Sequence, residues 1–187
     1  MSFPLDFPSV GVQNMTMRLR RVVAVSESPY TLDTQTYTHQ GARWEAEISL
    51  PPLTHSEARE IEGFIAGLKG MEGTFRFGNP IHTSSLSGYS VSSAAIRAEQ
   101  FNTGTSGAIP VGTHFQLLNR LYITTSTKAD GSAVLKFQPP LRDAITSSTT
   151  LTFNLPKTSW RLASNDIGWS INQASLYGFS FACVEAI

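Results

Sequence analysis

Residues 43–70, RWEAEISLPPLTHSEAREIEGFIAGLKG, carry the clearest secondary-structure signals in the chain. Over residues 43–50, apolar side chains alternate with polar ones, which is typical of a half-buried strand. The apolar positions are Trp44, Ala46, Ile48 and Leu50, and the polar positions are Glu45, Glu47 and Ser49. The stretch therefore predicts a strand with one face in a core and the other in solvent.

A helix is predicted directly after this strand. Pro51 and Pro52 stop the strand, because proline has no N–H group to donate to a sheet. Thr54, followed three residues later by Glu57, forms a capping-box pattern that satisfies free N–H groups at a helix start. The apolar residues that follow recur with helical spacing: Ala58, Ile61, Phe64, Ile65 and Leu68. The amphipathic helix is expected to end at Gly70, which tolerates the positive φ of a C-terminal cap.

Further strands are expected on the N-terminal side of this stretch. Residues 15–25, MTMRLRRVVAV, begin with period-two alternation, and the doublet Arg20–Arg21 breaks it, which indicates a bulge or a twist. Residues 26–29 are predicted to form a loop. Residues 35–40, QTYTHQ, are predicted to form a separate strand before Gly41.

The C-terminal half is predicted to contain short strands around a second core. Residues 78–93 are rich in Ser, Gly and Pro and are typical of a loop or linker. Strands are expected at 74–77, 113–118, 121–125, 133–137, 149–154 and 160–162. Asp130–Gly131 is a turn signal between two of them. Residues 175–187, SLYGFSFACVEAI, carry little charge, which favours a strand that is central or covered on both faces.

The chain is accordingly predicted to be mainly β (α+β), with one flanking amphipathic helix. Residues 1–78 and 157–187 would form a discontinuous domain, in which the C-terminal strand completes the sheet that shields the helix. Residues 79–156 would form a small inserted β-barrel domain, of a size that can just fold independently.

Composition limits the possible functions. The chain has 14 basic and 14 acidic residues and a net charge of +0, so no global attraction to nucleic acid or anionic membranes is expected. Charged residues make up 15%, which is low and compatible with close packing between copies. The single Cys183 leaves no disulfide framework or cysteine-rich metal site and is expected to be buried. The N-terminus lacks a secretory pattern, so synthesis and folding in a cytoplasm are expected.

Catalytic patterns are scarce. The histidines, His39, His55, His82 and His114, lack the spacing of a metal site, and the glycines and serines form neither a phosphate loop nor a nucleophile elbow. We therefore expect no enzyme, cofactor or metal. Arg18, Arg20 and Arg21 form the only basic cluster, with Glu45 and Glu47 as expected partners across the sheet. This group is interpreted either as a solvated strand face or as the lining of a channel or subunit contact.

Residues 17–80, MRLRRVVAVSESPYTLDTQTYTHQGARWEAEISLPPLTHSEAREIEGFIAGLKGMEGTFRFGNP, resemble the N-terminal part of minor tail proteins of tailed bacteriophages, of distal tail (baseplate hub) type. The later stretches that also fit this group are Leu121–Tyr122, Asp130–Gly131, Pro139–Arg142, Arg161–Asn165, Gly168–Trp169 and Tyr177–Phe181. The resemblance thus spans most of the chain.

The resemblance implies a structural virion protein at the tail tip. Distal tail proteins form a hexameric ring that connects the tail tube to the receptor-binding tip and lets DNA pass. The expected partners are other copies of the chain, the tail tube protein and tail-tip proteins, with only transient contact to genomic DNA and no stable nucleic-acid or membrane binding. The resemblance also implies a tail-tube-like β-sandwich or barrel for the first domain.

Three alternatives remain open from the sequence. The chain could be another tail ring component, such as a tube or terminator protein. It could be a carbohydrate- or receptor-binding tail module, in which aromatic residues of the insertion face a ligand: Tyr89, Phe101, Phe115 and Tyr122. It could also be a small tail-associated hydrolase, if a pocket brought a histidine and a carboxylate together.

Overall fold

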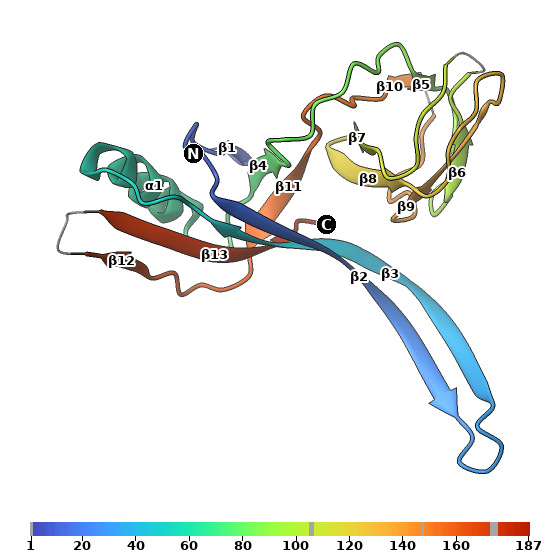
Figure 1. Cartoon of the computed structure of the whole chain (residues 1–187), viewed down its shortest axis with the longest axis horizontal. Coiled ribbons are helices and arrows are strands. Elements are labelled where there is room, and N and C mark those ends of the chain that lie inside the picture. The colour runs from blue at the N-terminus through green and yellow to red at the C-terminus, as the bar shows by residue number, and fades with distance from the viewer. Residues whose placement is uncertain (1, 105–106, 147, 173–175) are drawn as a thin grey trace.

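The computed structural model describes residues 2–104, 107–146, 148–172 and 176–187 (Figure 1). This part of the chain contains thirteen strands and one helix, which confirms the mainly β class with a single helix. The helix α1 spans His55–Leu68. The strands are β1 (Leu5–Asp6), β2 (Asn14–Glu27), β3 (Thr34–Ser49), β4 (Phe75–Gly78), β5 (Ser90–Val91), β6 (Gln100–Asn102), β7 (His114–Leu117), β8 (Arg120–Thr124), β9 (Val134–Gln138), β10 (Thr149–Thr150), β11 (Lys157–Leu162), β12 (Trp169–Ile171) and β13 (Tyr177–Glu185).

A seven-stranded sheet forms the body of the molecule. Its order is β1-β4-β11-β13-β3-β2, and β12 pairs with β13 outside this path. Every pair is antiparallel except β1 with β4. The C-terminal strand β13 lies between β3 and β11, so its predicted central position is confirmed. Residue 175, where this strand was expected to start, lies outside the described residues.

One face of this sheet is covered by α1, and the opposite face is open. The helix buries Ala58, Ile61, Phe64 and Leu68 against sheet residues that include Ile48 and Trp160. On β13, Phe179, Phe181 and Cys183 are buried on this inner face, whereas Ser180 and Ala182 are exposed. Burial raises the pKa of the Cys183 thiol to about 12, in keeping with its expected place in the core.

The predicted cap forms at the start of α1. The Thr54 N–H donates a hydrogen bond to the Glu57 carboxylate at 2.9 Å, and the Thr54 hydroxyl donates to the same carboxylate at 2.7 Å. The helix ends slightly earlier than expected, because Lys69 itself adopts a left-handed φ of 53° and its N–H donates to the Ala66 carbonyl. Gly70 follows with a φ of 69°.

The two strands predicted at 35–40 and 43–50 are one continuous strand, β3, so the expected break at Gly41 is wrong. Gly41 has another role, because a Cβ atom there would lie 3.1 Å from a methyl group of Val22. The partner strand β2 has the predicted bulge, between Arg21 and Val23. The loop predicted at 26–29 is also misplaced, since β2 continues to Glu27 and pairs with Thr34.

The inserted residues surround a second cluster of buried side chains (Figure 1). Their strands form a four-stranded sheet, β6-β9-β8-β7, and the pair β10-β5. The strand expected at 149–154 is reduced to Thr149–Thr150, because the segment changes partner: Thr150 pairs with Ser90, whereas Thr152 forms a bridge with Gln116 of β7. The domain boundaries at 78 and 157 stay a prediction.

Buried polar contacts fasten the insertion to the sheet. The Trp44 indole N–H donates to the Leu121 carbonyl at 2.8 Å, and Leu121 belongs to the core of the main sheet. Glu185, at the end of β13, is fully buried, and its Oε2 lies 3.2 Å from the Arg142 guanidinium. The same carboxylate oxygen accepts a hydrogen bond from the Trp44 backbone N–H at 3.1 Å. Arg142 also donates to the Ala42 carbonyl.

Glu185→Ala is expected to lower the free energy of unfolding by about 3–5 kcal/mol, because it leaves Arg142 without its carboxylate in a mostly buried site. Urea denaturation followed by tryptophan fluorescence measures the change. The matched control is Glu47→Ala, which removes an exposed carboxylate and should change stability by less than about 0.5 kcal/mol. A loss at Glu185 no larger than in the control would contradict this view of the junction.

Candidate functional site

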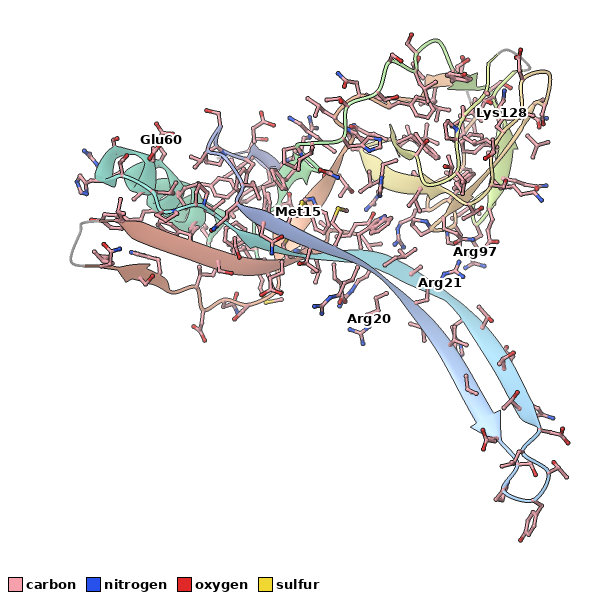
Figure 2. All side chains as sticks on the ribbon, in the orientation of Figure 1. Met15, Arg20, Arg21, Glu60, Arg97 and Lys128 are labelled. Atoms are coloured by element: carbon pink, nitrogen blue, oxygen red, sulfur yellow. The ribbon has the colours of Figure 1, made fainter. Side chains whose placement is uncertain are left out.

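The predicted cluster of charges is divided between two sides of the sheet. Arg18 and Arg20 lie on the open face of β2, and Glu45 and Glu47 lie on the same face of β3, with Arg18 opposite Glu45 in the register. Arg21 points the other way, because neighbouring side chains on a strand alternate between faces. Figure 2 shows Arg20 on the open side and Arg21 directed toward the insertion, near Arg97.

Glu45 is the centre of the ion pairs on the open face. Its Oε1 lies 2.9 Å from Arg43 Nη2 and 3.3 Å from Arg20 Nη1. Arg43 was not among the predicted site residues, although period-two counting along β3 places it on the same face as Glu45 and Glu47. The expected Arg–Glu pairing across the sheet is therefore confirmed for Arg20, which pairs with Glu45. Arg43 is an additional partner of Glu45. The lumen or subunit-contact role of these residues stays a prediction.

Arg21 contacts the insertion instead of its neighbours on β2. Its guanidinium donates a hydrogen bond to the Gln138 side chain and lies 3.7 Å from the Glu99 carboxylate. Both contacts involve exposed side chains, so their net contribution to stability is small. Arg21 thus marks the point where the sheet, the insertion and the outer half of β2 meet.

A shallow hollow of about 300 Å³ lies over the open face. Its lining residues are Thr16, Arg18, Arg20, Arg43, Glu45, Ala46, Glu47, Ala163, Ala182, Cys183 and Val184. Small side chains such as Ala163 and Ala182 lower its floor, and charged side chains form its rim. The three arginines and two glutamates nearly balance, so the surface can hold a polyanion only weakly.

A second hollow, of about 150 Å³, bears on the hydrolase alternative. It lies where β2 and β3 leave the body and is lined by both His39 and Glu99. In the described structure, however, the His39 ring packs edge-on against Tyr37, and Glu99 is paired with Arg21. Both side chains are exposed, and no hydrogen bond joins them among the described residues.

The outer halves of β2 and β3 form a projecting two-stranded arm, defined here as residues 22–41 (Figure 1). Beyond the bulge neither strand pairs with a further strand among the described residues. Large apolar side chains of the arm are therefore exposed: Val22 49%, Val23 46%, Val25 63%, Tyr30 94%, Leu32 70% and Tyr37 69%. Sequence reasoning missed this feature, although the strand at 35–40 has no apolar face, with threonines alternating against Gln35, Tyr37 and His39.

The four aromatic residues proposed as a sugar platform lie in the second core. Tyr89, Phe101, Phe115 and Tyr122 are at most 8% exposed. Phe115 stacks on Tyr122 with ring centroids 5.5 Å apart. Burial raises the pKa of the Tyr122 hydroxyl to about 12. The rings therefore do not gather on a surface, as the carbohydrate-binding alternative requires of them, and they supply apolar contacts within the insertion.

Among the described residues, no group of three or more His, Cys, Asp or Glu side chains is placed to hold a metal ion. The described part of the chain also contains no helix with the length and apolar character needed to cross a membrane. No protein-family model matches the chain, and no curated protein matches it.

The hydrogen bonds from Arg43 favour the ionised form of Glu45 and hold its pKa below the ordinary 4.5. Desolvation raises this pKa, and the hydrogen bond from Arg20 lowers it further. The stabilisation from these pairs is therefore present above pH 4.5 and is lost as the pH falls through the lowered pKa. Arg43→Gln should move the Glu45 pKa back toward 4.5, by more than Arg20→Gln does. Carboxyl-detected NMR titration measures both shifts, and a larger effect of Arg20→Gln would contradict this ranking.

Proposed function

We propose that the chain is a structural subunit of a long-tailed phage virion, a distal tail or baseplate hub protein. In this role it forms a ring that connects the tail tube to the receptor-binding tip and lets DNA pass through the centre. The sequence resemblance supports the family, and one structural observation carries the proposal, namely the projecting arm.

The arm has the properties of an assembly element. A two-stranded ribbon is marginally stable in water by itself, and the arm exposes apolar side chains on both of its faces. The outer edges of its two strands also leave backbone N–H and C=O groups available for pairing. A protein surface that covered the arm would bury these apolar side chains and pair these backbone groups. In a homo-oligomer the nearest such surface belongs to a neighbouring copy.

The position of the arm favours a ring. It extends from β2 and β3 at one edge of the seven-stranded sheet, whereas β1 and β4 form the opposite edge. A contact between opposite edges is heterologous, and heterologous contacts generate closed rings when the rotation between subunits fits. The open face, with Arg18 and Arg20, can then face the lumen. Its nearly balanced charges would hold the phosphate backbone weakly, as DNA passage requires.

Replacing residues 24–37 by a short Asn-Gly turn should give a folded monomer, because the arm contributes no residue to either core. Light scattering should give the mass of a ring for the unaltered chain and about 19 kDa for the variant, whose circular dichroism spectrum should still be that of a folded β protein. The control is a turn replacement of the same kind at Asp130–Gly131, which should leave the ring intact. An arm-deleted chain that still forms rings would contradict the proposal.

Arg18→Glu combined with Arg20→Glu tests the lumen assignment. If these side chains face the lumen, the ring mass should be unchanged, and weak low-salt retention of duplex DNA by the ring should disappear. Negative-stain images and a gel-shift titration measure the two effects. Loss of the ring in this variant would instead identify the open face as a subunit contact.

A further inference from the structure

A mostly apolar groove of about 300 Å³ lies at the sheet edge opposite the arm. One wall is the N-terminal segment that leads from β1 to β2, and the other is formed by the ends of β4 and β11. Its apolar side chains are Phe7, Val10, Val12, Phe77 and Leu155. Phe7 closes the floor by packing on Phe77 with ring centroids 4.6 Å apart.

Two cations flank this groove. Arg76 projects from β4 and Lys157 from the start of β11, and both side chains are exposed. Within the described residues no carboxylate lies within 4.0 Å of either one, although Asp6 is aligned with Arg76 in the β1–β4 register. None of the described residues that line the groove is acidic. The site is therefore suited to a ligand that combines an apolar group with negative charge.

The tip of the arm has this combination. Tyr30 is 94% exposed and Leu32 is 70% exposed. Glu27 and Asp33 stand on either side of them, and the whole arm, residues 22–41, contains no Lys or Arg. The tip thus presents two apolar side chains between two carboxylates, complementary to the groove in both polarity and charge.

The tip is also held in a defined shape. The Ser28 N–H donates to the Asp33 carbonyl at 2.9 Å, and the Leu32 N–H donates to the Ser28 carbonyl at 2.9 Å. The Ser28 hydroxyl accepts further hydrogen bonds from the backbone of Tyr30 and Thr31, both at 3.4 Å. A closed turn loses little conformational entropy on binding, so the exposed Tyr30 and Leu32 are preorganised for docking.

From these observations we infer that the arm tip of one copy binds in the groove of the next, with Tyr30 and Leu32 between the apolar walls and Glu27 and Asp33 facing Arg76 and Lys157. This contact rests on the proposed ring. It identifies the two surfaces, the arm tip and the groove, that meet between neighbouring copies. At about 3.3 Å per residue, Val22–Glu27 alone extend roughly 20 Å beyond the body, so the tip can reach a neighbour. Arm and groove lie at opposite edges of one sheet, so the contact runs in one direction around the ring.

Charge reversal tests the contact. Arg76→Glu with Lys157→Glu should raise the protein concentration at half-assembly about tenfold or more, and so should Glu27→Lys with Asp33→Lys. Combining all four changes should restore assembly to within about threefold of the unaltered chain. The matched control reverses two exposed charges elsewhere, Glu60→Lys and Lys136→Glu, and should have no effect. Light scattering over a dilution series gives each concentration.

Disulfide crosslinking gives a second readout. Ser9→Cys lies in the groove wall and Thr31→Cys at the tip, and the native Cys183 is buried and does not compete. The double variant should form a ladder of covalent oligomers on oxidation, whereas each single variant should not pass beyond a dimer.

The outcomes separate the two levels of the proposal. An unaltered chain that stays monomeric at every concentration overturns the ring and this contact together. A ring whose half-assembly concentration is unchanged by either pair of charge reversals, or that gives covalent species no larger than a dimer, overturns the contact alone.

Discussion

The pairing of β13 between β3 and β11 is the constraint on which the main sheet depends. Without it, β2–β3 and β1–β4–β11 would be two separate fragments, because no other described strand joins them. The last residues of the chain thus complete a core begun by the first half, with Phe179, Phe181 and Cys183 packed beneath α1. Glu185, at the end of this strand, then pairs with Arg142 of the insertion. The strand β13 thus holds both the main sheet and the insertion in place.

The same sheet explains why the arm projects. The inner face of β3 is buried from Ala42 onward, where Trp44 contacts the insertion and the later residues join the core that includes α1. Beyond the bulge at Arg21 no helix or further strand of the described chain packs against the arm, so Val23, Val25 and Tyr37 remain exposed. Contiguous exposed apolar surface of this kind marks an interaction site. The arginines at the base of the arm pair with Glu45 and Glu99. The carboxylates at the tip, Glu27 and Asp33, form no ion pair among the described residues.

Local sequence patterns predicted much of the fold but not its exposed extension. The alternation at Trp44–Leu50, the capping pair Thr54–Glu57 and the bulge after Arg21 are short-range signals, and the structure has all three. The arm could not be found in this way, because β propensity at 35–40 does not reveal whether a neighbouring surface exists. The break at Gly41 was misplaced for the same reason, since its small size serves the contact with Val22. At the candidate site, Arg43 was within reach of period-two counting, whereas the turn of Arg21 toward Gln138 depends on the insertion.

Electron cryo-microscopy of the assembled particle distinguishes a ring from other assemblies. We expect a closed ring with a central hole, in which the arm of each copy crosses to the next copy, so that its exposed valines and Tyr37 are covered there. The face that carries Arg18, Arg20, Glu45 and Glu47 should line the hole. A closed two-fold dimer, in which the two arms pair with each other, would contradict the proposed ring.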